Sequence, residues 1–346
     1  METEKEIAKK TARYRKEIEA HFNPYLFKIL ANVAKFCLEK TFTDIEVANM
    51  NYVKDSAEKG IVVYASNHKS YTDPLVLGLV LYKNSIKQPY YAAGRNMFNI
   101  WSSGILKSMG AFSVDRSNKD IIYLNTLKDY IGCLIKERKD ILLYIEGGRS
   151  YDGKMKGPKL GILKAILESQ NKDVSIIPVA VNYEQVLEDR VLTAIATKKN
   201  QRRFTDEAKE LFNICFNYSP AKKDGKRRYS SKAYVNFASP IKIRDYSAKR
   251  SDLKNLAWRI IEEIRSSKHP SSTSIVAAAT LNTSVNSNEA KMSEIEKNIL
   301  KISSDINEVM KEGIDYFISR NTLSVKGGIV SIKEPKILEY YANGLQ

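Results

Sequence analysis

The chain has 346 residues, of which 56 are Lys or Arg and 40 are Asp or Glu, so its formal net charge is +16. Because 43% of the residues are hydrophobic, the chain can fill a sizeable core, which excludes a disordered protein and a small disulfide scaffold. The positive charge favours an acidic partner: nucleic acid, an anionic membrane surface or a phosphorylated small substrate. Composition does not choose among these three.

Signals for targeting and for metal binding are absent from this sequence. The first 20 residues mix both charges without an apolar core, so we expect no secretory signal and a cytoplasmic protein. The most apolar stretch, residues 74–82, is about half as long as a membrane-spanning helix, so we expect no such helix. The three cysteines lie far apart without neighbouring histidines, which predicts neither a disulfide framework nor a metal site.

An apolar stripe with helical spacing runs through the N-terminal region. The spacing predicts a helix over residues 4–40, with basic residues beside the stripe. Two interpretations stay open, since the stripe can pack against its own domain or lie on a lipid surface. The stripe comprises Phe22, Tyr25, Leu26, Ile29, Leu30, Val33, Phe36 and Cys37.

Short runs of β-branched and aromatic residues follow, most of them separated by helical stretches. They are typical of strands covered on both faces, so we expect an α/β fold with a mixed, largely parallel sheet flanked by helices. Pro178 interrupts the fourth run, which indicates an edge strand or a bulge. The runs are residues 60–66, 89–93, 141–146, 174–181 and 233–238.

The later part of the chain begins with a basic segment. Residues 190–232 carry 12 Lys and Arg against 4 Asp and Glu, so they supply half of the excess charge. Residues 271–288 are small and polar at their end and are interpreted as a junction. A helical repeat over 295–310 and a hairpin over 322–332, turning at two glycines, then predict a small helical subdomain.

These patterns predict three regions. Residues 1–55 form an N-terminal helical region, residues 56–270 form the α/β domain, and residues 271–346 form a small C-terminal helical subdomain. Because sites in such sheets are built on loops at the carboxyl ends of strands, polar residues directly after the strand runs are the candidate site residues.

The first such loop is NHKSYTDP, residues 67–74, directly after the run at 60–66. Pro74 suits the first turn of a helix, so Asp73 is expected to cap that helix while the loop folds His68 back onto it. Taken alone, this spacing is equally typical of a structural cap. A second short motif, GAFSVDRS at 110–117, ends in Asp115 and Arg116 and by itself indicates a surface ion pair.

The richest motif is YIEGGRSYDGKMKGPKLGIL, residues 144–163. Paired glycines allow a sharp turn and a close approach to a ligand, while arginine and lysine offer donors to a phosphate. The Walker order of residues is absent, which disfavours nucleotide phosphoryl transfer. The alternative is a plain glycine turn with solvated lysines. Its candidate residues are Glu146, Gly147, Gly148, Arg149, Ser150 and Lys159.

The motifs, with IPVAVNYEQVLE as a fourth, resemble in order and separation the four blocks of the glycerolipid acyltransferases. The third and fourth blocks are most similar to the glycerol-3-phosphate and dihydroxyacetone-phosphate acyltransferases. VNFASPIKI, HPSSTSIVAAATL and ILEYYANGLQ continue the likeness, which covers roughly residues 55–346. One departure is that Asp115 precedes Arg116 where this group has an Arg doublet. The Asp-Arg pair is more similar to the lysophosphatidate acyltransferases. In a milder departure, Asn67 and Lys69 flank His68.

The resemblance implies a glycerol-3-phosphate 1-O-acyltransferase, which catalyses the first step of phospholipid synthesis. Dihydroxyacetone phosphate and lysophosphatidate are the alternative acceptors. His68 would be the general base and Asp73 its orienting carboxylate. Glu146 would either pair with Arg149 or bind a hydroxyl of the acceptor. The phosphate-binding residues would be Arg116, Arg149 and Lys159, and the other substrate-binding residues Gly147, Gly148 and Ser150, with glycine N–H groups as oxyanion donors.

Acyl-CoA or acyl-carrier protein would be the donor, and no cofactor or metal is expected. The basic segment at 190–232 could receive this acidic donor or anionic lipid, or be a solvated face. We therefore expect a cytoplasmic protein peripherally bound to the cytoplasmic face of the membrane. Two rival functions are a thioesterase with the same His68–Asp73 pair and a nucleic-acid-binding protein, for which no recognition motif is visible.

Overall fold

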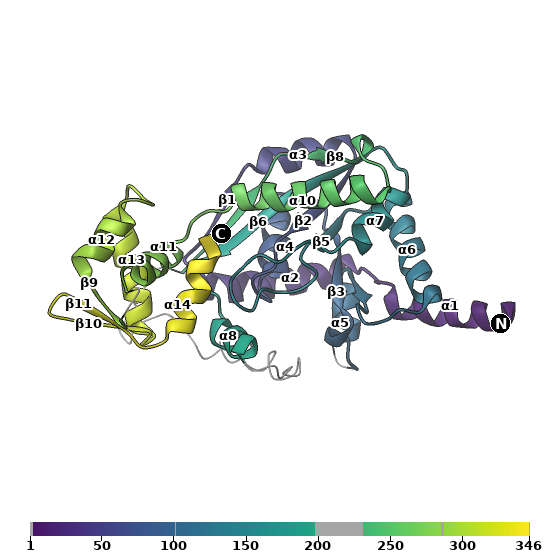
Figure 1. Cartoon of the computed structure of the whole chain (residues 1–346). Helices are drawn as coiled ribbons and strands as arrows, with labels where there is room; N and C mark the ends of the chain where they lie inside the picture. The colour runs from purple at the N-terminus through teal and green to yellow at the C-terminus, as the bar shows by residue number, and fades with distance from the viewer. Residues whose placement is uncertain (1–2, 101, 198–230, 285–286, 346) are drawn as a thin grey trace.

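The computed structural model describes residues 3–100, 102–197, 231–284 and 287–345 (Figure 1). Most of the basic segment predicted at 190–232 lies outside the described residues, so its interpretation stays a prediction. Among these ranges, no helix combines the length and the apolarity that crossing a bilayer requires.

A mixed sheet of eight strands in the described residues forms the centre of the molecule, in the order β1-β7-β6-β2-β5-β3-β4, with β8 beside β6. Five of its strand pairs are parallel, and only the pairs of β6 with β7 and with β8 are antiparallel. The predicted α/β fold with a mixed, largely parallel sheet is confirmed. The strands are β1 (Asp44–Ala48), β2 (Ile61–Ser66), β3 (Tyr90–Gly94), β4 (Ala111–Val114), β5 (Ile141–Tyr144), β6 (Val174–Tyr183), β7 (Lys232–Phe237) and β8 (Ile241–Lys242).

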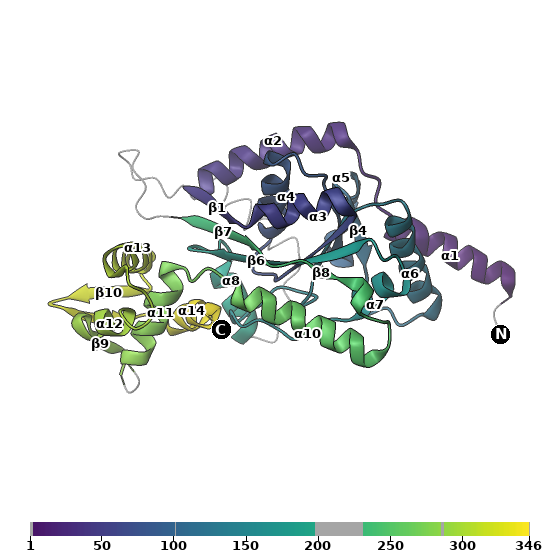
Figure 2. The same cartoon turned by 90° about the horizontal axis from the view of Figure 1, so that it is seen from above.

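Helices cover both faces of this sheet (Figure 2). Alternate residues of β2 enter two separate cores, since Val62 and Tyr64 belong to one and Ile61 and Val63 to the other. Every residue of this strand is buried, as its unbroken apolar run predicts. One face packs against α2 (Pro24–Thr41), α3 (Met50–Lys59) and α4 (Asp73–Lys83), and the other against α1 (Glu4–Ile18), α6 (Ile121–Lys136), α7 (Gly161–Glu168) and α10 (Arg250–Ser266).

The C-terminal part contains the predicted hairpin, formed by β10 and β11. A third strand, β9, pairs with β11 and was not predicted from the sequence. The hairpin turns at Gly327 and Gly328, whose φ angles of 57° and 76° suit glycine. Residues 272–283, interpreted as a junction, instead form the buried helix α11, because their small apolar residues pack against α12, α13 and α14. The elements are α11 (Ser272–Thr283), β9 (Glu289–Lys291), α12 (Met292–Ile299), α13 (Ile306–Ser319), β10 (Leu323–Lys326), β11 (Ile329–Ile332) and α14 (Pro335–Ala342).

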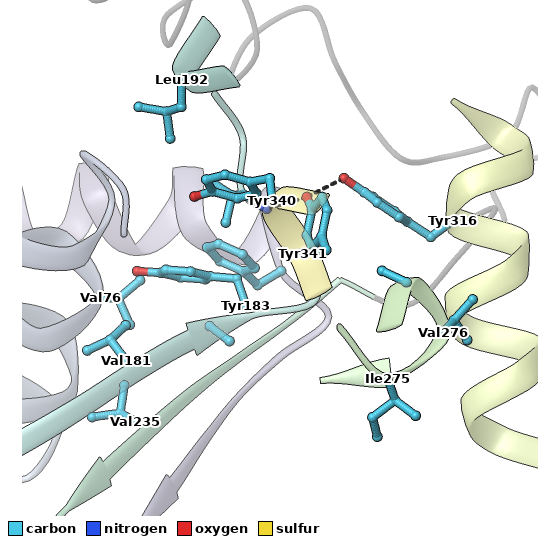
Figure 3. Packing of buried hydrophobic residues seen from close by; sticks show 14 of the residues in the cluster. Val76, Val181, Tyr183, Leu192, Val235, Ile275, Val276, Tyr316, Tyr340 and Tyr341 are labelled. Carbon is cyan, nitrogen blue, oxygen red and sulfur yellow. Dashed lines mark hydrogen bonds between the residues drawn. The ribbon is translucent and has the colours of Figure 1, made fainter. Parts of the chain in front are cut away.

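One hydrophobic core continues from the central sheet into the C-terminal elements (Figure 3). Tyr183 of β6 and Tyr341 of α14 belong to this same cluster, and the Tyr341 hydroxyl lies 2.6 Å from that of Tyr316. Tyr341 also donates a hydrogen bond of 2.8 Å to the fully buried carboxylate of Asp189, which forms an ion pair with Arg320. The C-terminal elements therefore pack directly on the sheet, and the predicted boundaries at residues 55 and 270 stay predictions.

The helical pattern predicted over residues 4–40 forms two helices, α1 and α2. Pro24 disfavours helical backbone at the residue before it, and the Asn23 side chain accepts hydrogen bonds from the N–H groups of Tyr25 and Leu26. A new helix therefore begins at Pro24. The stripe lies mainly on α2, where its outer residues are exposed to solvent.

Pro178 does not mark an edge strand, since β6 lies inside the sheet between β2 and β7. On the side facing β7, the pairing with β8 involves Ser175 and Ile176, and the pairing with β7 starts at Val179. Pro178 occupies the gap between these two partners, where a missing N–H donor breaks no ladder bond.

Candidate active site

His68 and Asp73 lie together at the carboxyl end of β2. The Nδ1 atom of His68 is 2.7 Å from Oδ2 of Asp73, whose side chain is 1% exposed. The same carboxylate accepts hydrogen bonds from the N–H groups of Lys69 and Ser70 and from the Tyr183 hydroxyl, at 2.7, 3.0 and 2.6 Å. Asp73 is the first residue of α4 and not its N-cap. Its carboxylate holds the predicted loop in place through these hydrogen bonds.

The imidazole of His68 is held between a carboxylate and an aromatic ring. It stacks on Tyr144 with 3.9 Å between the ring centroids and 14° between the planes. Burial lowers the pKa of His68, the hydrogen bond to Asp73 opposes this shift, and the charges of Arg149 and Arg116 lower the pKa further. The ring is therefore neutral at pH 7, and with Nδ1–H donated to Asp73, its basic lone pair is on Nε2.

A polar pocket of about 100 Å³ adjoins His68. It is lined by His68, Arg116 and Arg149, together with Gly148 and Tyr144. Arg116 follows β4 and Arg149 follows β5, and both strands run parallel to β2 in the same sheet, so the three side chains meet at one edge. The pocket thus combines a neutral base with two guanidinium groups.

Arg149 is held rigidly at this pocket, with only 7% of its side chain exposed. Its Nη1 lies 3.4 Å from Oε1 of Glu188, and its guanidinium carbon lies 3.5 Å from the centre of the Tyr71 ring. Glu188 also accepts hydrogen bonds from the Ser70 hydroxyl and the Tyr71 N–H group, at 2.8 and 2.7 Å. Burial raises the pKa of Glu188, and the charge of Arg149 opposes that shift. Glu188 therefore joins Arg149 to the His68 loop.

Glu146 is held by backbone groups. Its two carboxylate oxygens accept hydrogen bonds from the N–H groups of His68 and Lys156, at 2.9 and 2.7 Å, and its side chain is buried. Pairing with Arg149 was one of two alternatives for Glu146, and Glu188 is an acidic partner that this arginine has in the structure. Glu146 instead ties the His68 loop to the loop after β5.

An apolar cavity of about 200 Å³ lies beside the polar pocket. The two share the side chains of Tyr71, Pro74, Tyr91 and Met97 as a common wall. The rest of the cavity lining is almost entirely apolar and includes Phe27, Leu75, Leu77, Leu106 and Met109. A bound molecule with a polar head and an aliphatic tail therefore matches the pair of cavities.

Residues 44–182 match the model of the acyltransferase family. This part of the chain is therefore similar to the acyltransferases. The chain is similar to the glycerol-3-phosphate acyltransferase of Pseudoalteromonas atlantica, with 30% identity over 77% of this chain and 32% of that protein. The corresponding protein of Pasteurella multocida is 31% identical over 66% of this chain and 28% of its own length.

The chain therefore spans about a third of the length of the curated relatives that it matches. Among solved structures, it is similar to the 1-acyl-sn-glycerophosphate (LPA) acyltransferase PlsC from Thermotoga maritima. That comparison has a TM-score of 0.42 and 14% identity, and it covers 70% of this chain and 78% of that one.

The glycine turn after β5 differs from the expectation in one detail. Gly147 has a φ of +68°, which suits glycine, and its N–H group donates a hydrogen bond of 2.9 Å to the Tyr144 carbonyl. This N–H group is therefore engaged and is not an oxyanion donor. Gly148 lines the polar pocket, and within the described residues its N–H group has no hydrogen-bond acceptor.

Two other candidate site residues, Ser150 and Lys159, do not line the polar pocket. The Ser150 N–H group donates a 3.1 Å hydrogen bond to the His68 carbonyl, and its hydroxyl contacts Asp152, so the buried Ser150 supports the loop. Lys159 lines a different hollow, beside Lys254 and Trp258. Its N–H group donates a 2.8 Å hydrogen bond to the Ile145 carbonyl, and Lys159 is not among the residues that line the polar pocket with Arg116 and Arg149, so its role in phosphate binding stays a prediction.

Sequence reasoning missed Glu188 and the apolar cavity. Glu188 is 39 residues from Arg149 and follows the strand run of the fourth block, where no spacing rule links it to a base. The cavity could have been suspected from the continuous apolar sequence PLVLGLVL of α4, since a helix that is apolar all round must be covered on several sides.

Proposed function

We propose that this protein is a glycerol-3-phosphate 1-O-acyltransferase. One observation carries this proposal: the His68–Asp73 pair faces a polar pocket that contains Arg116 and Arg149 and adjoins an apolar cavity. A phosphorylated alcohol suits the polar pocket, and a fatty acyl chain suits the cavity. The relatives described above, which are glycerol-3-phosphate acyltransferases, support the same assignment.

The proposed reaction starts with the neutral imidazole. Nε2 of His68 takes the proton of the sn-1 hydroxyl while the hydroxyl oxygen attacks the thioester carbonyl, and Asp73 stabilises the imidazolium that forms. When the tetrahedral intermediate collapses, the carbon–sulfur bond breaks and the leaving thiolate takes the proton back from His68. The products are the ester and a free thiol, and His68 is again neutral. Positioned general-base catalysis contributes a factor of about 10² to 10⁴.

Two other groups complete the proposed site. Arg116 and Arg149 bind the phosphate dianion through their forked N–H donors, which match phosphate oxygens geometrically. The N–H group of Gly148 donates to the oxyanion of the tetrahedral intermediate. Asp115 does not line the pocket and instead pairs with Arg95 at 3.7 Å, so we expect it not to determine the choice of acceptor.

We also propose that the protein binds an anionic membrane surface through α2. The outer face of this helix exposes Tyr25, Ile29, Val33 and Phe36, whose exposed fractions lie between 52% and 83%. Lys28, Lys35 and Lys40 lie on the same helix and suit acidic lipid headgroups. Phe27, also on α2, lines the apolar cavity, so a membrane-bound α2 would bring the acyl-chain cavity to the lipid.

The function is tested by incubating the purified protein with palmitoyl-CoA and each of three acceptors and identifying the products by mass. We expect glycerol 3-phosphate to be acylated at the sn-1 hydroxyl with a kcat/KM at least about tenfold above that for lysophosphatidate, equivalent to roughly 1.4 kcal/mol. The third acceptor is dihydroxyacetone phosphate. A preference for lysophosphatidate would reassign the acceptor, and release of free fatty acid without an acceptor would favour a thioesterase.

The donor is tested in the same assay with palmitoyl-carrier protein in place of palmitoyl-CoA. A filter-binding measurement with polynucleotide at 150 mM salt is the control for the basic charge, because adventitious nucleic-acid binding weakens steeply with salt. Retention of nucleic acid without any acyl transfer would contradict the proposed function.

A further inference from the structure

The molecule has a third hollow that the proposed mechanism does not use. It has a volume of about 550 Å³ and lies between the segment 156–160 and helix α10. We call it the Trp258 hollow. Its lining residues are Lys156, Gly157, Pro158, Lys159, Leu160, Lys254 and Trp258.

The side chains of the Trp258 hollow are unusual for a surface without a function. Trp258 is 48% exposed, although it is the largest apolar side chain of α10 and the opposite face of that helix is buried in the core. Within the described residues, the ammonium groups of Lys159 and Lys254 have no hydrogen-bond or ion-pair partner. The Lys156 ammonium is bonded to the Arg149 carbonyl. An exposed indole beside two available cations matches a purine ring that carries phosphates.

The turn at Gly147 and Gly148 lies next to both pockets, because the side chain of Lys159 lies against Gly147 and that of Arg116 against Gly148. A Cβ atom on Gly147 would lie 2.6 Å from Cγ of Lys159, which lines the hollow, whereas Gly148 lines the polar pocket. The glycines add no side chain of their own, so the groups next to the turn are the long side chains of Lys159 and Arg116. An extended chain that runs from the hollow to His68 would pass beside these two cations.

On the basis of the proposed function, we infer that the Trp258 hollow binds the nucleotide of an acyl-CoA donor. The adenine stacks on Trp258, Lys159 and Lys254 contact the phosphates, and the pantetheine arm crosses the Gly147–Gly148 turn to bring the thioester to His68. This assignment gives Lys159 an anion to bind, but on the donor and not on the acceptor. It also selects coenzyme A over a carrier protein, because a carrier protein presents no purine for the indole.

Binding of the nucleotide can be measured without any acyl transfer. The chain has two tryptophans, so Trp101→Phe leaves Trp258 as the single indole reporter. Titration with adenosine 3′,5′-bisphosphate and with desulfo-coenzyme A should quench its fluorescence saturably. Adenosine and inorganic phosphate, titrated separately, should each bind at least about tenfold more weakly, because each supplies only one of the two contacts.

Lysine variants distinguish specific nucleotide binding in the Trp258 hollow from non-specific attraction to the positively charged protein. Lys159→Ala with Lys254→Ala should weaken nucleotide binding about tenfold, whereas the matched exposed lysine variant Lys128→Ala on α6 should leave it unchanged. The absence of saturable quenching in the parent, or equal weakening by Lys128→Ala, would overturn the inference.

Turnover gives a second readout. Trp258→Ala should raise the KM for palmitoyl-CoA about tenfold while the KM for glycerol 3-phosphate and the kcat stay within about twofold, and Trp258→Phe should restore most of the loss. With S-palmitoyl pantetheine, which has no nucleotide, Trp258→Ala and the parent should be equal. A raised KM for palmitoyl-carrier protein with unchanged nucleotide binding would assign the hollow to a carrier protein and refute the inference.

The two proposals fail in distinguishable ways. A protein that binds the nucleotide at Trp258 but transfers no acyl group refutes the proposed function alone. A protein that acylates glycerol 3-phosphate while Trp258 reports no nucleotide refutes only the present inference.

Discussion

The His68 loop and the outer face of α2 are opposite in construction. In the loop, the buried carboxylate of Asp73 accepts four hydrogen bonds, and Glu146 and Glu188 hold neighbouring backbone groups. On α2, large apolar side chains such as Tyr25 and Ile29 are exposed. The groups proposed for chemistry are thus preorganised by buried polar contacts. The surface proposed to bind lipid instead has apolar area that is exposed to solvent and available for a partner.

Removal of the proposed general base, His68, should cause the largest loss of activity. His68→Ala should lower kcat by about 10² to 10⁴ while the fold persists, because only the proton acceptor is lost. Asp73→Asn should also lose most of the activity, and the double variant should be little worse than His68→Ala, since both residues act through one imidazole. Steady-state kinetics with circular dichroism as the folding control measures this, and near-parental turnover of His68→Ala would end the mechanism.

The next test removes the carboxylate that joins Arg149 to the loop. Glu188→Ala should lower the free energy of unfolding by about 3 kcal/mol, because it removes the carboxylate partner of a buried guanidinium. Glu188→Gln should recover part of this stability, because its amide oxygen can still accept the Tyr71 N–H bond. Both variants should raise the KM for glycerol 3-phosphate, because neither has the carboxylate that holds the Arg149 guanidinium in place. Urea unfolding and kinetics on both variants measure the two effects. Equal KM values in parent and Glu188→Gln would make Glu188 purely structural.

Arg149→Lys tests the phosphate assignment inside the same network. A point charge replaces a fork, so the KM for glycerol 3-phosphate should rise about tenfold and more than that for the acyl donor. Initial rates with each substrate varied in turn give both constants. If only the KM for the donor changes, Arg149 belongs to the thioester site.

Binding of the exposed face of α2 to anionic vesicles should be released by high salt. Ile29→Glu with Phe36→Glu should reduce binding to anionic vesicles about tenfold, because the pair removes apolar area and adds negative charge. The matched pair Ile121→Glu and Leu124→Glu changes exposed apolar residues of α6 and should leave binding unchanged. Vesicle flotation in low and high salt measures this, and a bound fraction that resists both salt and alkaline wash would contradict a peripheral contact.

The smallest expected effect concerns pH. Because burial holds the pKa of His68 below its ordinary value of 6.5, the neutral base should persist below pH 6.5, and kcat/KM should fall only as pH drops through the lowered pKa. Arg116→Met removes a nearby positive charge, so the pKa should rise and the acid limb should move to higher pH. Arg149→Lys keeps its charge and should leave that limb in place. A limb that moves to lower pH in Arg116→Met would contradict the electrostatic account.

The local features of the chain could be predicted from the sequence. Unbroken apolar runs indicated the buried strands because side chains alternate between two covered faces, and His68 and Asp73 were linked because only a short loop separates them. Arg116 and Arg149 were expected at one site through the resemblance to the glycerolipid acyltransferases. The structure gives the physical reason, since parallel strands present their carboxyl ends at the same edge of a sheet.

The tertiary structure alone decided the contacts between distant segments. Glu188 reaches Arg149 across 39 residues, Pro178 fits an interior strand because two partners leave a gap, and Lys159 faces Trp258 because α10 packs beside it. Each of these depends on which elements become neighbours in space. Hydrophobic periodicity shows which face of a helix or strand is buried, but it does not show which element packs against that face. The sequence by itself therefore determined the catalytic loop and the strands. The packing of the sheet and its helices determined which distant residues contact the site.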